Sequence, residues 1–445
     1  MRAVQTSNSR PDVSLITFAE QADITLIFTL ELARDKTTNR LVGSHHPKEA
    51  IQLLLDGTGL KPTFSSDGHI NIATAEAPVA GGEAMNNGEF SVSNRFGLRD
   101  VPGDPTRILR DSRLDPRIRA ALDVEGEYAP GVAPVRVDAS YEECVEYCTA
   151  FEKAAAATHT ELLAAMPDFD SVATSTEVIR GDDGNDITLY IYQPLRRTGP
   201  VPCIVYAHGG GMVFGTARDP MFVRLFNEFA ARGLVVVGVE FRNGAGECGN
   251  HPFPAGLNDC ASAVRWTHAN RTHLDISSIV IAGESGGGNL SAATAIKAAR
   301  EGWVEMIDGV YAMCPYICGA YADPPDDLVS LRENDGYMLS ADSAVPMVKV
   351  YDPTGEHAHN PLAWPLQATP ADLQGLPPHV ISVNELDPLR DEGLAFYRKL
   401  LDAGVSAVAR TVHGTPHGGD LNYPDVVGDV FAETVASVRA FAYRL

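Results

Sequence analysis

The stretch from residue 279 to 290, IVIAGESGGGNL, constrains the fold of this chain most strongly. Three apolar residues run into a Gly-x-Ser-x-Gly pentapeptide centred on Ser285, and a run of small residues at helical composition follows. A strand, a sharp turn and a helix in this order are the context that a nucleophile elbow requires. The glycines at 283 and 287 let the backbone and the helix approach closely. A plain Gly-rich turn is the alternative, and the other motifs of the chain decide between the two.

A run of three glycines follows another predicted strand, in the sequence YAHGGGM at 206–212. Without side chains, these residues leave their backbone N–H groups free to turn inward. Together with the N–H of Gly286, the N–H groups of Gly209 and Gly210 are predicted to hold the negative oxygen of a tetrahedral intermediate. A phosphate-binding loop is the alternative, but the Lys-Ser/Thr pair of a Walker loop and a spaced Gly-x-Gly-x-x-Gly are both missing.

A reactive serine needs a base and an acid that orients it, and both candidates follow late strands. His413 and His417 come after the last predicted strand, and the two glycines after His417 favour it as the base. Asp387 stands just beyond the strand predicted at 378–383, with Glu385 as the rival acid. The order serine, aspartate, histidine is the chain order of α/β hydrolases.

Strand and helix patterns alternate over residues 175–445, which predicts an α/β fold with a central, mostly parallel sheet. Strands are predicted at 175–180, 187–192, 203–207, 234–239, 280–282, 309–313, 378–383 and 407–412, and helices at 221–232, 257–268 and 290–300. The first two strands form a hairpin. Residues 105–174 are helical in composition, clearest at 114–122 and 141–166, and are predicted to form a lid over the catalytic domain.

The first 73 residues are predicted to be a small α+β unit, joined to the rest by a linker at 74–104 that is rich in Ala, Gly, Asn and Pro in its first part. Its predicted elements are a helix at 13–22, a strand at 24–28, a helix that begins at Pro47, and strands at 60–64 and 69–72 about a Ser-Asp-Gly turn.

The catalytic motifs together resemble those of the hormone-sensitive-lipase family of esterases, which has the α/β-hydrolase fold. The matching motifs are HGGG at 208–211, HPFPA at 251–255, GESGG at 283–287, DPLRD at 387–391 and HG at 417–418. The resemblance is strong over 175–445 and looser over 105–174. It implies a serine carboxylesterase with Ser285, Asp387 and His417 as its triad. The family usually has Asp and Ala where this chain has Glu284 and Gly286, but a lactone-opening member shares this variant. Dimers formed through the last strand and helix are common in the family.

The N-terminal unit resembles the short N-terminal domain of secretins and TonB-dependent receptors. FAEQA at 18–22, LVG at 41–43 and AIQLLLDGTGL at 50–60 carry this likeness. The likeness implies a docking or signalling role with a protein partner, in the periplasm.

The negative net charge of the chain limits the classes of partner that it is expected to bind. Lys and Arg number 35 against 58 Asp and Glu, a net charge of −23, so neither nucleic acid nor an anionic membrane is an expected partner. No apolar run reaches the roughly 20 residues of a membrane span. The N-terminus lacks the apolar core of a signal peptide, which predicts a cytoplasmic protein, or a periplasmic one if a leader is missing. Seven scattered cysteines are expected to be reduced thiols.

The sequence therefore predicts a carboxylesterase that cleaves a small-molecule ester, either short-chain or lactone-type. Its mechanism needs no cofactor and no metal, and two histidines at His357 and His359 without nearby carboxylates make a weak metal site. Two alternatives stay open. An amidase or lactonase would use the same triad, and a non-catalytic, ligand-sensing signalling protein would keep the fold without the turnover.

Overall fold

A computed structural model describes residues 2–5, 26–27, 42–45, 47–55, 58, 60–64, 70–74, 107–124, 135–136 and 138–445 of the chain. The chain forms two compact units, Met1–Glu89 and Phe90–Leu445. Each unit is described by itself.

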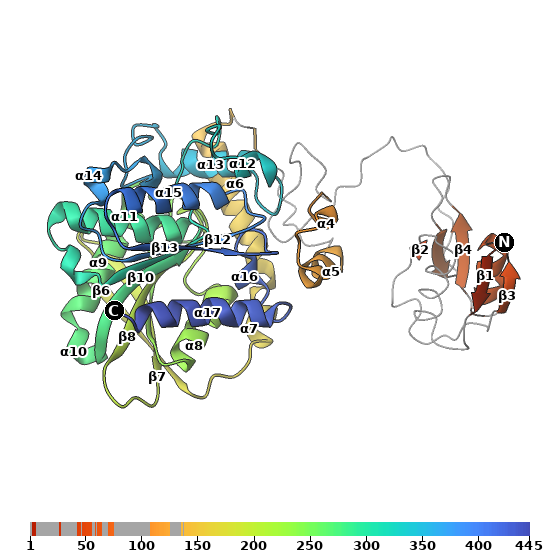
Figure 1. The fold of residues 1–445 in the computed structure, drawn as a ribbon, viewed down its shortest axis with the longest axis horizontal. Coiled ribbons are helices and arrows are strands. Elements are labelled where there is room, and N and C mark those ends of the chain that lie inside the picture. The colour runs from red at the N-terminus through yellow and green to blue at the C-terminus, as the bar shows by residue number, and fades with distance from the viewer. Residues whose placement is uncertain are drawn as a thin grey trace. The chain divides into compact units, whose positions relative to one another are not determined.

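The described part of the first unit contains two small sheets and a helix (Figure 1, red and orange). One sheet pairs β1 (Arg2–Gln5) antiparallel with β3 (Val42–His45), and the other has the order β2 (Leu26–Ile27), β5 (Ile70–Thr74), β4 (Leu60–Phe64). Helix α3 (Pro47–Leu55) begins at its proline, as expected, and buries Ala50, Ile51 and Leu55. The predicted helix at 13–22 lies outside the described residues, and β1 was not predicted.

The second unit is built on an eight-stranded sheet with the order β13-β12-β11-β10-β8-β9-β7-β6. Its strands are β6 (Val172–Arg180), β7 (Asp186–Pro194), β8 (Val201–Ala207), β9 (Val235–Glu240), β10 (Ile276–Glu284), β11 (Gly309–Met313), β12 (His379–Asn384) and β13 (Ala407–Val412). Strand β7 pairs antiparallel with β6 and β9, and the other pairs are parallel. The predicted mostly parallel sheet and its N-terminal hairpin are confirmed.

Helices cover both faces of this sheet (Figure 1). The long ones are α8 (Pro220–Ala231), α9 (Ala255–Ala269), α11 (Gly286–Glu301), α15 (Arg390–Asp402) and α17 (Gly428–Ala442). Alternate residues of a strand point to opposite faces, so β8 contributes Val205 to a core that includes residues of α9, α11 and α15, and Ile204 to a core that includes residues of α8 and α17. Burial on both faces explains why the strands read as continuous apolar runs.

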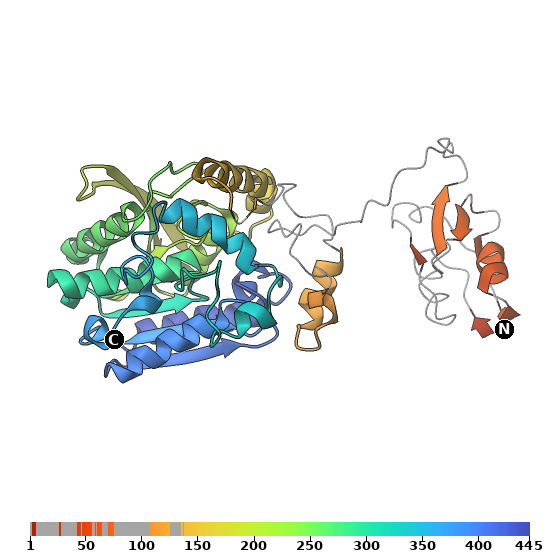
Figure 2. The same ribbon diagram turned by 90° about the horizontal axis from the view of Figure 1, so that it is seen from above.

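The helical region before the sheet is more broken than its sequence suggests. The segment predicted as one helix at 141–166 forms α6 (Tyr141–Ala155), a 3-10 turn at Ala156–Thr158 and α7 (His159–Ala164). Helix α6 packs beside α13 (Ala341–Tyr351), as Figure 2 shows. Two further helices, α4 (Arg107–Arg110) and α5 (Pro116–Val124), precede it.

The remaining short elements are α10 (Arg271–Leu274), α12 (Ser330–Glu333), α14 (Pro370–Leu373) and α16 (Gly419–Asn422), with 3-10 turns at Val304–Met306 and Pro365–Gln367. No helix in the described part of the chain has both the length and the apolar character that crossing a bilayer requires.

Candidate active site

The turn at Ser285 has the geometry of a nucleophile elbow. Strand β10 ends at Glu284 and α11 begins at Gly286, and between them Ser285 has φ +53° and ψ −117°, a strained conformation for a residue with a side chain. Its N–H donates to the Met313 carbonyl at 2.9 Å, and its own carbonyl accepts from the N–H of Tyr316 at 3.1 Å. A Cβ on Gly287 would lie 1.9 Å from the Ala207 carbonyl oxygen, so the close packing of strand and helix requires glycine there.

Ser285, His417 and Asp387 form a hydrogen-bonded chain. Ser285 Oγ lies 3.0 Å from His417 Nε2, and His417 Nδ1 lies 2.8 Å from Asp387 Oδ2. Asp387 is buried, and its other oxygen accepts the N–H of Leu389 at 2.8 Å. The structure thus brings together the three residues that the sequence singled out, from loops after β10, β12 and β13.

His413 and Glu385, the rival base and acid, form a separate pair. His413 Nδ1 lies 3.1 Å from Glu385 Oε2, and the His413 side chain is 76% exposed. Glu385 also accepts the N–H of Gly414 at 2.9 Å. These contacts fasten the start of the loop that carries His417, and neither side chain is bonded to Ser285.

Asn384 anchors the other end of that loop, a role that the sequence did not reveal. Its amide donates to Thr415 Oγ1 at 2.7 Å and to Asp420 Oδ1 at 2.8 Å, and its carbonyl oxygen accepts the N–H of Gly418 at 3.3 Å. Asn384 lies three residues before Asp387, so one segment fixes both the acid and the loop of the base. Its position in the Asn-Glu-Leu-Asp-Pro run was the available signal.

The loop that contains Gly209, Gly210 and Gly211, the glycine loop, lies against the start of α11. A Cβ on Gly286 would lie 2.7 Å from the nitrogen of Gly211, so the two backbones face each other directly. Gly210 has φ +92°, and its carbonyl accepts the N–H groups of Val213 and Phe214 at 3.0 and 3.2 Å. Within the described residues, the N–H groups of Gly210 and Gly286 donate no hydrogen bond, which leaves them free for a ligand oxygen.

Glu284 lies beneath this loop with its carboxyl group buried. A Cβ on Gly209 would lie 1.9 Å from Glu284 Oε1, which shows how closely the two residues pack. Burial raises the pKa of Glu284 well above its usual value, which favours the neutral form of the carboxyl group. The neutral form of this acid does not oppose a negative charge that develops above it.

Two more titratable groups support the loop from behind. The buried His208 ring stacks on Phe241, with centroids 4.1 Å apart, and burial lowers its pKa to about 4. Its Nε2 lies 3.8 Å from Glu240 Oε1. Burial raises the pKa of Glu240 to about 7. With its pKa lowered to about 4, His208 is neutral at pH 7.

The site opens into a cavity of about 730 Å³. Ser285, His417 and the glycine loop line one side of it. Mostly apolar residues of α6, α7, α13 and the neighbouring loops line the rest, among them Tyr147, Phe151, Ala155, Leu162, Met166, Tyr316, Leu339, Met347 and Leu421. The helices of the predicted lid region therefore form a wall of this cavity.

Comparisons with known proteins agree with this geometry. Residues 204–420 match a family described as having the alpha/beta hydrolase fold. The Mycobacterium tuberculosis carboxylesterase NlhH is 35% identical over 54% of this chain and 73% of its own length. An arylesterase of Saccharolobus solfataricus is 30% identical over 58% of this chain and 80% of its own. The solved structure of brefeldin A esterase, described as a bacterial homologue of human hormone sensitive lipase, is 42% identical with a TM-score of 0.69, over 75% of this chain and 94% of that one.

The sheet, the strained elbow and the order of the motif residues define an α/β hydrolase. The chain belongs to the α/β-hydrolase family that these esterases represent. It is a serine ester hydrolase of the carboxylesterase class.

Proposed function

We propose that the protein hydrolyses short-chain or lactone-type carboxylic esters through an acyl-enzyme on Ser285. The observation that carries the proposal is the hydrogen-bonded chain from Ser285 through His417 to the buried Asp387, at the edge of a mostly apolar cavity. A base within hydrogen-bond distance of the serine, itself oriented by a third group, is what serine catalysis needs.

In this mechanism Ser285 Oγ attacks the ester carbonyl while His417 Nε2 takes the serine proton. His417 then gives this proton to the leaving alcohol. Asp387 holds the proton on Nδ1, which keeps Nε2 free to accept, and it stabilises the imidazolium ion. Water repeats the attack on the acyl-enzyme, and Ser285 is restored.

The N–H groups of Gly209, Gly210 and Gly286 are the proposed donors to the oxyanion. The free N–H groups of Gly210 and Gly286 support this role. Gly209, whose N–H hydrogen-bonds to the buried Glu284 carboxyl group, is the third proposed donor. Losing one such donor costs about 2.7–4 kcal/mol of barrier in comparable enzymes.

A p-nitrophenyl ester series from acetate to palmitate, with wild type and Ser285→Ala, tests the function. We expect the best rate at short acyl chains and a loss of about 10⁴- to 10⁶-fold in the variant, because the nucleophile is gone. Circular dichroism checks that the variant is folded. A variant that keeps more than about a tenth of the wild-type rate would exclude Ser285 as the nucleophile.

The same assay separates the alternatives. A wild-type protein that turns over no ester but binds one would support the ligand-sensing alternative. Faster turnover of a p-nitroanilide than of the matching ester would support the amidase alternative. The esterase relatives favour the ester.

The N-terminal region, residues 1–73, is proposed to be a docking module of the secretin and TonB short N-terminal type that binds a protein partner. Residues 74–104 serve as its linker, 105–174 as the lid region and 175–445 as the catalytic domain. The AIQLLLDGTGL run at 50–60 and the helix α3, which contains its first six residues, support the proposal.

A homodimer formed through β13 and α17 is also proposed. Strand β13 is an edge of the large sheet, and Val408 on it is half exposed, although such edges are usually protected. The molar mass from light scattering at micromolar concentration tests this assembly.

A further inference from the structure

Cys314 is a buried cysteine that the proposed mechanism does not use, yet it lies beside the triad. Strand β11 ends at Met313, and Cys314 then has φ +34°, in the left-handed region that favours glycine. Its N–H donates to the Ser382 carbonyl at 2.7 Å, which fixes the backbone. A strained residue at a site is a reason to look for function there.

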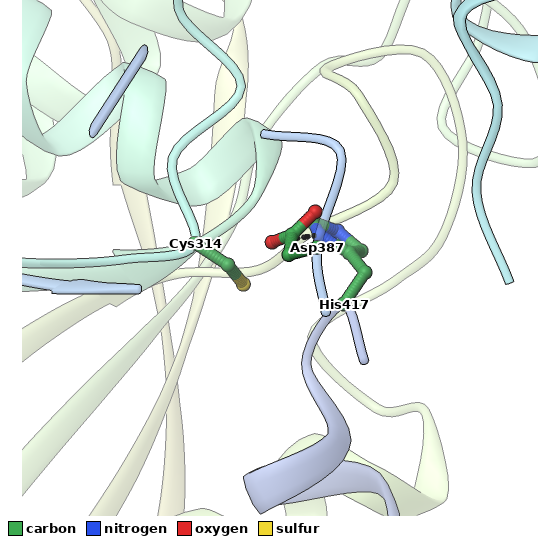
Figure 3. Close-up of side chains that lie close together, drawn as sticks. All are labelled: Cys314, Asp387 and His417. Carbon is green, nitrogen blue, oxygen red and sulfur yellow. Dashed lines mark hydrogen bonds and ion pairs between the residues drawn. The ribbon is translucent and has the colours of Figure 1, made fainter. Parts of the chain in front are cut away.

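The thiol lies close to two triad side chains. The sulfur of Cys314, a carboxylate oxygen of Asp387 and a ring nitrogen of His417 all lie within 4.8 Å of one another. Figure 3 shows the three side chains close together. In the described part of the chain this is the only group of three such side chains that is close enough to share an ion. The three residues come from separate loops, after β11, β12 and β13.

These donors match zinc better than magnesium or calcium. Zinc binds thiolate, imidazole and carboxylate at about 2.0–2.3 Å, so ligand atoms around it lie roughly 3.3–3.7 Å apart, and a shift of about 1 Å closes this group onto an ion. Magnesium and calcium prefer oxygen alone. Zinc with one thiolate and one carboxylate is neutral overall, which suits a site where Cys314 and Asp387 are buried.

We propose that Cys314, Asp387 and His417 form an inhibitory site for a thiophilic divalent cation of the zinc class. The inference rests on the proposed function, because the cation binds two residues of the proposed catalytic triad. The cation reaches the site from the substrate cavity, which Ser285, Cys314 and His417 all line.

Zinc inhibits hydrolysis because its binding changes which ring nitrogen of His417 carries a proton. Zinc bonds to the sulfur, and the thiol proton is released to solvent. Zinc also bonds to His417 Nδ1 in place of the proton that Asp387 held there, and the ring proton moves to Nε2 through water. Nε2, which lies 3.0 Å from Ser285 Oγ, then carries a proton and no longer accepts one from the serine. The ion is neither oxidised nor reduced.

The experiment titrates zinc chloride into the chelator-treated full-length protein and measures p-nitrophenyl butyrate hydrolysis and heat of binding in parallel. We expect reversible inhibition at micromolar zinc, one bound ion, recovery with EDTA and no effect of magnesium. For Cys314→Ser and Cys314→Ala, inhibition is measured against the rate of each variant without zinc. The zinc concentration that halves this rate is at least thirtyfold higher than for wild type. Cys248→Ala is the matched control, because Cys248 is the most exposed of the described cysteines, and its inhibition stays within threefold of wild type.

Ser285→Ala separates this inference from the proposed function. It lacks activity but keeps all three ligands, so its zinc affinity stays within threefold of wild type. An active wild-type protein that zinc does not inhibit would contradict the zinc site but not the proposed esterase function. Inhibition of both Cys314 variants at the same zinc concentration as wild type would do the same. Two Cys314 variants are used so that one that fails to fold, judged by its thermal transition without zinc, leaves the other to decide. A wild-type protein that is inactive without zinc would contradict the proposed function. Calorimetry would still measure zinc binding at the proposed site.

Discussion

His413 and His417 are four residues apart on one loop, but only His417 is bonded to Ser285. We therefore expect His417→Ala to lower kcat on p-nitrophenyl butyrate about 10⁴-fold or more, because the base is lost. His413→Ala should keep most of the activity, because that side chain is exposed and pairs with Glu385. Rates of the two variants on the same ester decide. An inactive His413→Ala beside an active His417→Ala would reverse the assignment.

Glu240 predicts a particular dependence of stability on pH. Its pKa is about 7 in the folded protein, raised from 4.5 by burial, so between these values the folded state binds more protons than the unfolded state. Stability from this group is therefore present at low pH and is lost as pH rises from 4.5 to 7. The loss is about 3 kcal/mol, at 1.36 kcal/mol per pKa unit.

Glu240→Gln removes this titration. The unfolding free energy of the variant, relative to wild type, should rise by about 3 kcal/mol between pH 4.5 and pH 8. Urea unfolding at several pH values measures it. A constant difference between the two proteins across this range would show that Glu240 does not titrate as described.

What the sequence revealed at the residue scale depended on local motifs. Ser285, Asp387 and His417 could be predicted because each stands in a short pattern at the end of a strand. Glu284 and Cys314 could not be assigned a role, because their behaviour depends on burial among segments that are distant in the chain. Nothing in the order of residues shows that Cys314 lies beside Asp387.

At the scale of elements, the sheet was predictable and some of the helices were not. The strands are buried on both faces and read as apolar runs, so their positions followed from composition. Helix α13 was not predicted, and it contains an internal proline, Pro346, which usually ends a helix. The break between α6 and α7 was also missed, since its residues, Ala156–Thr158, continue an Ala-rich stretch that favours a helix.

Glu152 joins α6 to two loops, the one that follows the glycines and the one that follows β9. Its carboxylate accepts the N–H groups of Gly215 at 2.7 Å and Glu247 at 2.6 Å. In Glu152→Gln one of these N–H groups meets an amide NH₂ and loses its acceptor, and such a bond to a charged group contributes about 1.5–3 kcal/mol. We expect a lower melting temperature and kcat/KM about tenfold lower on p-nitrophenyl butyrate.

Glu146→Gln is the matched control, because Glu146 is exposed on the same helix. It should resemble wild type in both measurements. Equal effects of the two substitutions would mean that the charge of α6, and not the contact of Glu152 with the loop, matters.

At the scale of the whole molecule, the catalytic unit was predictable because its motifs occur in one order over a long span. The N-terminal unit was harder, since short strands such as β2 carry little pattern. The helix from Pro47 and the strands β4 and β5 were found because they have a clear start signal and a turn between them.

The first unit should be dispensable for the chemical step. Every proposed nucleophile, base, acid and oxyanion donor lies after residue 200, in the unit Phe90–Leu445. A chain that begins at Asn87 should therefore form its acyl-enzyme within about threefold of the full-length rate, which corresponds to less than about 1 kcal/mol of barrier. Burst kinetics with p-nitrophenyl acetate on both proteins measure this rate, and a thermal transition checks that the shorter chain folds. A folded short chain with a hundredfold slower burst would show that the first unit completes the active site, and the two-part organisation would have to be abandoned.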